Sequence, residues 1–93
     1  MKELQFDIKY RHQIESGECR VVTREGRPVE IKIWDLRGEF PVVGVYFDEN
    51  NNRDTVVQVT AEGKCSIKPD DEYCDDLFIL TTDNPLSYKE ANI

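Results

Sequence analysis

Hydrophobic residues after residue 19 come in short runs, and at residues 29–33 they alternate with polar residues with a period of two, which is the pattern of a β-strand. Short apolar runs rich in Val and Ile are separated by turns that contain Gly, Pro, Asn or Asp. Gly26 and Gly63 lie in two of these turns, where glycine reaches backbone conformations that other residues avoid. The pattern predicts short strands at residues 20–23, 29–34, 42–47, 55–60, 65–67 and 77–80.

Residues 3–17 fit two patterns. Leu4, Phe6 and Ile8 alternate with polar residues, as in a strand. Phe6, Tyr10 and Ile14 are spaced four apart, as on one face of a helix. The spacing therefore leaves open whether residues 3–10 are strand or helix.

A helix over residues 7–16 would have a suitable residue at each end. Asp7 is a favoured N-cap, and Gly17 is the residue type that most often follows the last residue of a helix. We therefore expect a short strand or extended segment at residues 3–6, followed by a helix at residues 7–16.

Together these elements predict an α+β domain dominated by β-structure. It has one short N-terminal helix and a curled antiparallel meander of five to six short strands. The helix can cover the apolar face of the sheet, or the sheet can curl into a small half-open barrel. The length of 93 residues fits one domain. We assign residues 1–81 to it and expect residues 82–93 to form a loosely ordered C-terminal tail.

The net charge of −7 comes entirely from the second half of the chain. Residues 1–46 carry eight acidic and eight basic residues, whereas residues 47–93 carry eleven acidic and four basic residues. The pI near 4.6 argues against binding to nucleic acid or to anionic membranes, because both require clustered Lys and Arg. The charge distribution therefore predicts no direct nucleic-acid partner and no membrane partner.

Five acidic residues gather in one segment of the second half. They are Asp70, Asp71, Glu72, Asp75 and Asp76. Such a cluster can bind a divalent ion or a basic partner, but a solvated loop that repels itself is the simpler interpretation. The segment is a candidate acidic patch.

Compartment and cofactor use follow from the apolar runs and the cysteines. Near residue 1 there is no apolar core of a secretory signal, and no run is long and apolar enough for a membrane helix. The three cysteines lack metal-binding spacing; a Cys65–Cys74 disulfide is compatible with their spacing, but three reduced thiols are the simpler interpretation. These features predict a cytoplasmic protein without a cofactor.

The polar segment between two predicted strands resembles part of a calcium-binding loop. Four oxygen-bearing side chains occupy alternate positions in it, namely Asp48, Asn50, Asn52 and Asp54. Arg53 stands where such loops have Gly, and Val59 stands where they have a bidentate Glu. The segment predicts at most a weak divalent-ion site, and a solvated hairpin loop is the simpler interpretation.

Catalytic motifs are absent from the sequence. His12, the one histidine, precedes Cys19 by seven residues, but a catalytic Cys–His pair also needs hydrogen-bond contact and an orienting group. His12 falls on the polar side of the expected helix, and no phosphate-binding loop or hydrolase motif occurs. The sequence therefore predicts a protein that is not an enzyme.

An exposed aromatic pair is the most specific candidate for a binding surface. If the β-branched residues of 29–33 face the core, Trp34 faces outward. If the odd-numbered residues of 43–47 face the core, Tyr46 also faces outward. Exposed Trp, Tyr and Arg are typical interface anchors, although the helix or the tail can instead cover this face and pack both rings. The candidate binding residues are Trp34, Tyr46, Lys32 and Arg37.

Several turn-and-strand motifs occur in a characteristic order. They are Val-Thr-Arg-Glu-Gly-Arg-Pro-Val at 22–29, Phe-Pro-Val-Val-Gly at 40–44, Thr-Ala-Glu-Gly-Lys at 60–64 and Asp-Leu-Phe at 76–78. This order, across residues 6–80, resembles a group of small, uncharacterised β-rich proteins carried by phages, plasmids and integrated elements of gut bacteria. The resemblance implies a mobile-element context and a small β-rich fold, and it assigns no functional residue.

We therefore expect a non-catalytic protein-interaction module, an accessory protein of a mobile genetic element. Its protein partner would dock on the Trp34 and Tyr46 face or on the acidic half. One alternative is an acidic decoy for a nucleic-acid-binding host protein, and another is a weak divalent-ion-binding domain. Exposed strand edges predict a monomer or a weak homodimer.

Overall fold

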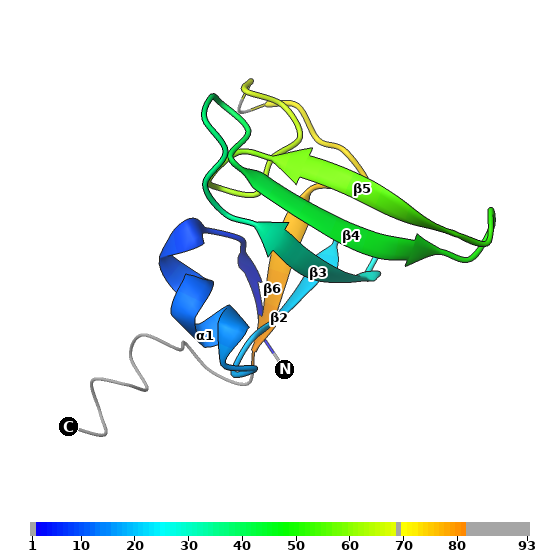
Figure 1. Cartoon of the computed structure of the whole chain (residues 1–93), viewed down its shortest axis with the longest axis horizontal. Coiled ribbons are helices and arrows are strands. Elements are labelled where there is room, and N and C mark those ends of the chain that lie inside the picture. The colour runs from blue at the N-terminus through cyan, green and yellow to red at the C-terminus, as the bar shows by residue number, and fades with distance from the viewer. Residues whose placement is uncertain (1, 69, 82–93) are drawn as a thin grey trace.

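The computed structural model describes residues 2–68 and 70–81, in which a β-sheet is accompanied by one short helical segment (Figure 1). The helical segment is a 3-10 turn, η1 (Ile8–Tyr10), that continues into α1 (Arg11–Glu15). The β-dominated α+β fold is thus confirmed, whereas the expected tail at residues 82–93 lies outside the described residues. The strands are β1 (Lys2–Gln5), β2 (Arg20–Thr23), β3 (Pro28–Ile33), β4 (Val42–Asp48), β5 (Arg53–Val59) and β6 (Leu77–Thr81).

All the strands belong to one antiparallel sheet in the order β1-β6-β2-β3-β4-β5. The strands from β2 to β5 form a meander, as predicted, but β6 returns and inserts between β1 and β2. The two ends of the sheet, β1 and β5, do not pair with each other, so the sheet is open. The half-open barrel is therefore not confirmed.

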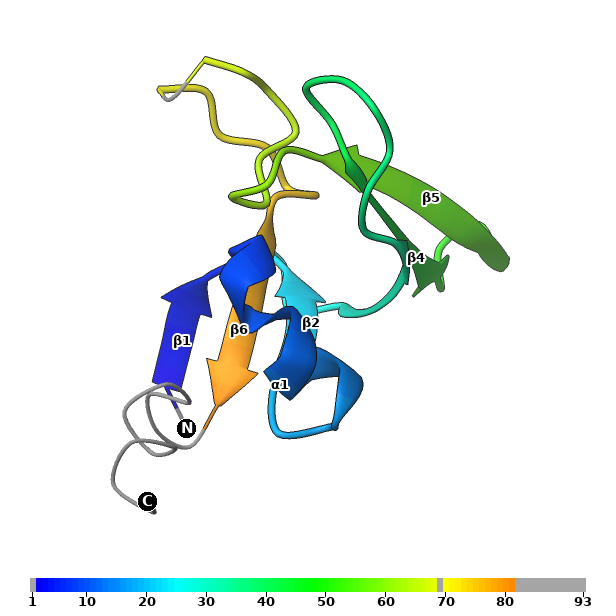
Figure 2. The same cartoon turned by 60° about the vertical axis from the view of Figure 1, so that its left-hand side comes forward.

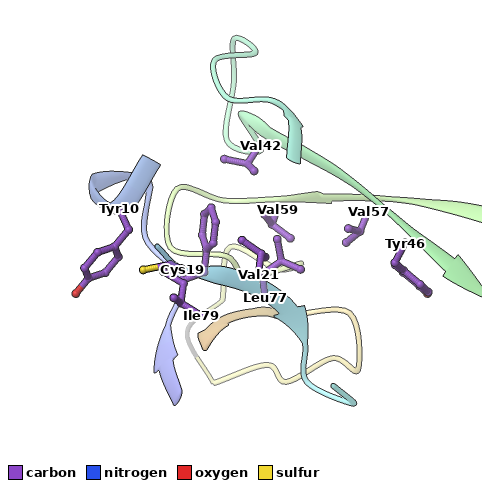
Figure 3. Packing of buried hydrophobic residues seen from close by; sticks show 10 residues of the cluster. Tyr10, Cys19, Val21, Val42, Tyr46, Val57, Val59, Leu77 and Ile79 are labelled. Carbon is purple, nitrogen blue, oxygen red and sulfur yellow. The ribbon is translucent and has the colours of Figure 1, made fainter. Parts of the chain in front are cut away.

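The core lies between the two halves of this twisted sheet. In Figure 2, β1, β6 and β2 lie side by side with α1 across one face, while β4 and β5 belong to the other half. Figure 3 shows side chains from both halves pointing toward one another. The most deeply buried hydrophobic residues are Phe6, Val42, Val59, Leu77 and Ile79.

The helical segment begins and ends close to where the sequence pattern predicts. The Asp7 carboxylate accepts a hydrogen bond from the backbone N–H of Lys9 at 2.9 Å, which is the expected N-cap contact. At the other end Gly17 has a φ of +87°, the left-handed conformation that suits glycine. Phe6 and Tyr10 are both buried, so the apolar stripe does face the core.

The strand predicted at residues 65–67 is wrong, because side chains from the later acidic residues bind this segment. The backbone N–H of Cys65 donates to Asp76 Oδ1 at 2.8 Å, and the Ser66 hydroxyl donates to Asp71 Oδ2 at 2.9 Å. The segment therefore belongs to a loop that leads from β5 to β6.

The face of β4 that packs on the core is the opposite of the predicted one. Val42 and Tyr46 are buried, whereas Phe47 is 51% exposed. Gly44 allows this inner face to approach β3 closely, because a Cβ added at Gly44 would lie 2.6 Å from Val29 Cγ1.

A β-bulge in β3 explains the unexpected orientation of Trp34. Ile31 pairs with Gly44 and Ile33 pairs with Val43, so β3 has one more residue than β4 at this point. One extra residue moves the following side chains to the opposite face of the sheet. Trp34 therefore packs against the core, and Ile33, which was expected to face the core, is 37% exposed.

Candidate protein-interaction site

Tyr46 lies inside the fold and not on an exposed aromatic surface. Its hydroxyl donates a hydrogen bond to Asp75 Oδ1 at 3.0 Å, and the Arg27 guanidinium lies 5.5 Å from the ring centre. Burial and the neighbouring Asp75 carboxylate raise the pKa of Tyr46, because both disfavour the phenolate. Tyr46 therefore links β4 to the acidic segment (residues 70–76).

Trp34 is half-buried against a different set of groups. Its ring stacks on Phe6 with 6.0 Å between the ring centres, and the Arg11 guanidinium lies 5.3 Å from the ring centre. Trp34 also lines a groove of about 560 Å³ between α1, β2 and β3, together with Ile14 and Ile31. The two aromatic rings predicted to form an exposed pair are thus both packed, as the alternative interpretation had it.

The two basic residues predicted beside the aromatic pair are exposed. Lys32 lies at the bulge, with its Nζ atom 2.9 Å from the Glu30 carboxylate. Arg37 lies in the connection between β3 and β4. Because Trp34 and Tyr46 face the core, these cations do not border the exposed Trp34–Tyr46 pair that the sequence predicted.

The acidic segment is organised around a buried carboxylate, that of Asp76. Its Oδ1 atom accepts the N–H of Cys65, and its Oδ2 atom accepts the N–H of Tyr73 at 3.0 Å. The Arg24 guanidinium and the Lys64 ammonium contact Oδ2 at 3.1 and 3.2 Å. Burial alone would raise the pKa of Asp76, but these donors outweigh burial and lower the pKa to about 2.

Arg24 holds the acidic segment against β2 and β6. Its Nε atom donates to the backbone carbonyl of Tyr73 at 3.1 Å, and its guanidinium lies 4.9 Å from the Phe78 ring centre. A further contact, at 3.8 Å, joins it to Glu72. The prediction of a self-repelling solvated loop is therefore wrong for Asp76, the last residue of this segment.

The remaining acidic residues of the segment differ in their surroundings. Asp71 accepts a hydrogen bond from Ser66, and Asp75 accepts one from Tyr46, whereas Asp70 and Glu72 are exposed. The exposed negative charge is thus smaller than the number of acidic residues suggests.

In the polar hairpin between β4 and β5, the Asp48 carboxylate stabilises the turn by accepting hydrogen bonds. Asp48 accepts hydrogen bonds from the Asn51 side chain at 2.7 Å and from the Asn50 N–H at 3.0 Å. The Asn51 contact is the main reason why the pKa of Asp48 is lowered. Asn52 has a φ of +52°, and Asp54 belongs to β5. Across residues 2–68 and 70–81, no group of three or more His, Cys, Asp or Glu side chains is placed to hold a metal ion.

The proposed partners of a Cys–His pair have unsuitable environments. Burial raises the pKa of the Cys19 thiol, whereas a nucleophilic cysteine needs a lowered pKa. Burial and the Asp76 carboxylate raise the pKa of Cys65 to about 12. His12 is exposed on α1, as predicted.

Iodoacetamide is expected to modify Cys74 before Cys19 and Cys65. The pKa of each thiol is raised, so exposure decides the order of reaction, and Cys74 is the exposed cysteine. Peptide mass spectrometry over a time course measures the order, with the urea-unfolded chain as the control in which all three react. Faster modification of Cys19 in the folded protein would contradict this assignment.

An apolar surface that the sequence reasoning assigned to the core lies on the outside of β3, β4 and β5. Cross-strand pairing places Val56 beside Val45, and Ile33 beside Val43, on one face of the sheet. We call this the outer face; it consists of Ile33, Val43, Val45, Phe47 and Val56. Val56 is 66% exposed, the highest value among the large hydrophobic residues described.

Polar residues border the outer face on both sides. Glu30 of β3 pairs with Val45 and forms the ion pair with Lys32. On β5, Asp54 lies opposite Phe47 and Gln58 lies opposite Val43. The arrangement is an apolar centre with a polar rim, which is how protein–protein interfaces are built.

One signal in the sequence could have revealed the outer face. Both alternating sets of β4 are apolar or aromatic, one with Val42 and Tyr46 and the other with Val43, Val45 and Phe47. A strand that is apolar on both faces needs cover on both faces. The outer set is only partly covered among the described residues, since Val43 and Val45 are half-buried and Phe47 is exposed.

Comparisons with protein-family models, with curated proteins and with solved structures found no match. Within the described ranges, no helix is both long and apolar enough to cross a membrane. The candidate site therefore rests on the geometry of the outer face.

Proposed function

We propose that this chain is a non-catalytic protein-interaction module that binds a protein partner through the outer face. The observation that carries the proposal is the exposure of Phe47 and Val56, two large apolar side chains on the same face of neighbouring strands. Burying such side chains against a partner contributes about 25 cal/mol per Å² of apolar area removed from water. Phe47 is the expected anchor, since aromatic residues dominate binding energy at interfaces.

The chemistry of the outer face favours a protein partner with an apolar patch of its own. Of the charges that border it, Glu30 and Lys32 form an ion pair and Asp54 is negative, so this surface offers no cluster of cations for a phosphate backbone. The accessory role in a mobile genetic element and the cytoplasmic location belong to the same proposal. They are supported by the order of the turn motifs and by the reduced cysteines.

The acidic decoy has less support than an apolar interface. Arg24 and Lys64 contact the buried Asp76, so part of the negative charge of the acidic segment is already compensated within the fold. A decoy would bind a basic surface through exposed charges and lose affinity as salt rises. Binding through the outer face would persist at high salt.

Phe47→Thr is expected to weaken capture of the partner by about tenfold or more, because it removes the anchor of the outer face. Thr retains high β-propensity, so β4 is preserved. Ile67→Thr is the matched control, since Ile67 is 59% exposed but lies in the loop between β5 and β6. The measurement is affinity capture from host lysate at low and high salt, quantified by mass spectrometry. Equal capture by both variants, or a partner released by salt alone, would contradict the proposal.

A further inference from the structure

The two edges of the sheet are protected very differently. β1 is four residues long and carries exposed Lys2 and Glu3, which are devices that prevent a strand edge from pairing with another chain. β5 is seven residues long and pairs with β4 in unbroken register from Arg53 to Val59, so it has no bulge to turn its edge away. It also has no Lys and no Pro, and its two charged residues, Arg53 and Asp54, both lie at its hairpin end, so residues 55–59 carry no charge. β5 therefore offers an unprotected template for pairing.

The position of β5 leaves this edge accessible. β5 is the last strand of the sheet and hydrogen-bonds only to β4 among the described strands. The β4–β5 hairpin projects from the rest of the fold (Figure 1). At the middle of β5 stands Val56, at 66% exposure. Backbone groups along the outer edge thus lack a partner strand within the described part of the chain.

We propose that β5 pairs antiparallel with β5 of a second copy of this chain, centred on Val56. In this register Val56 lies opposite Val56 of the second copy, so two β-branched side chains meet at the two-fold axis. Asp54 lies opposite Gln58 of the second copy, and the reverse pair is identical by symmetry.

The side chains of β5 are compatible with this register. The Gln58 Nε2 group already donates to the backbone carbonyl of Phe40 at 2.9 Å, and its second N–H can donate to Asp54 of the second copy. On the inner side, Arg53 faces Val59 of the second copy, and Thr55 faces Val57. No two like charges face each other along the strand, which is why a second copy fits this edge.

The pairing produces a closed dimer and not a fibre. Each copy contributes the same edge, so the interface is isologous and uses up both β5 strands. The remaining edges of the joined sheet are the two short, charged β1 strands. Assembly therefore stops at two copies.

Strand pairing of this length buries less than the roughly 1,200 Å² typical of stable complexes. We therefore expect an equilibrium that depends on protein concentration. The inference goes beyond the proposed function, because it concerns the backbone edge of β5, although Val56 on this edge also belongs to the outer face. Since Val56 meets its own copy on that face, the outer faces of both copies lie on the same side of the joined sheet. The dimer would present the proposed partner-binding surface twice.

A charge swap at the two-fold axis tests the register. Val56→Lys and Val56→Glu each place two like charges opposite one another, and each is expected to weaken self-association by about tenfold or more. Mixed in equal amounts, the two variants are expected to recover the dimer, because Lys then faces Glu. Ile67→Lys and Ile67→Glu, alone and mixed, are the matched controls. Sedimentation equilibrium over a dilution series measures mass, and far-UV circular dichroism checks the fold.

Three outcomes overturn the dimer proposal: a wild-type chain that stays monomeric throughout the dilution series, single variants that dimerise as the wild type does, or folded variants whose mixture fails to recover the dimer. Phe47→Thr is expected to leave the dimer unchanged, since Phe47 lies on β4, away from the edge. Loss of the dimer in Phe47→Thr would indicate face-to-face packing and would also overturn the edge register. Partner capture is measured separately, so either proposal can fail while the other holds.

Discussion

Replacing Asp76 with Asn is expected to lower the free energy of unfolding by about 3 kcal/mol, because it removes a buried charge that two cations share. Asn keeps the shape of the side chain, and its carbonyl can still accept the N–H of Cys65. Its amide NH₂ group, however, would take the place of Oδ2 and point at the N–H of Tyr73 and at Arg24. Donors would then face donors in a buried site.

Chemical denaturation at neutral pH, followed by the fluorescence of Trp34, the one tryptophan, measures this loss. Asp70→Asn is the matched control, since Asp70 is an exposed carboxylate in the same segment. The control is expected to change stability by no more than about 0.5 kcal/mol. Equal losses in the two variants would mean that Asp76 does not organise the acidic segment.

The pKa of Asp76 also predicts how stability depends on pH. The folded-state pKa is about 2, below the ordinary value of about 3.9. A carboxylate with a lowered pKa adds stability above its unfolded-state pKa and loses that contribution as pH falls through its folded-state pKa. The contribution, on the order of 2–3 kcal/mol, should be complete above about pH 5 and disappear on acidification toward pH 1. In Asp76→Asn this component of the pH profile should be absent.

The strands and the helix could be predicted because their signals are local. Asp7 and Gly17 mark the ends of the helical segment within the sequence itself, and β2 and β4 are apolar runs bounded by turns. The failure at residues 65–67 has a non-local cause. The partner of the Cys65 N–H is Asp76, eleven residues later, and no periodicity encodes that contact.

The place of β6 in the sheet could not be read from the chain for a similar reason. Residues 77–80 look like one more strand of a meander, which would place them beside the preceding strand. In the fold, the loop held by Asp76 and Arg24 returns the chain to the other half of the sheet. There β6 pairs with both β1 and β2. The pairing is set by tertiary contacts of the loop.

The prediction that Trp34 and Tyr46 are exposed was wrong because it assigned the wrong face of the sheet to the core. In β4 both faces are apolar, so alternation alone could not decide which side packs inward. Tyr46 faces inward because Asp75 accepts its hydroxyl hydrogen bond there, and Gly44 makes room for Val29 on the same side. Trp34 faces inward because of the bulge in β3. The outer face therefore carries the side chains that the sequence analysis had assigned to the core.

Gly63→Ala is expected to lower the free energy of unfolding by about 2–5 kcal/mol, because the collision of the added methyl group adds to the backbone penalty. Gly63 is buried, and a Cβ at this position would lie 2.6 Å from Phe6 Cβ and 3.1 Å from the carbonyl oxygen of Leu77. Neither atom is the end of a flexible side chain. Gly63 also accepts a hydrogen bond from the N–H of Leu77 at 2.8 Å, so the backbone cannot move away without loosening the start of β6.

Gly17→Ala separates the two causes of this loss. Gly63 has a φ of +81° and Gly17 a φ of +87°, so an Ala at either position pays the same backbone penalty of about 1–2 kcal/mol. No atom lies within 4 Å of the Cβ position at Gly17, so that variant lacks the collision with Phe6. The difference between the two variants in urea denaturation therefore measures the collision. Equal losses would mean that the loop before β6 can shift away from the N-terminal segment, so that Gly63 is required for its conformation alone.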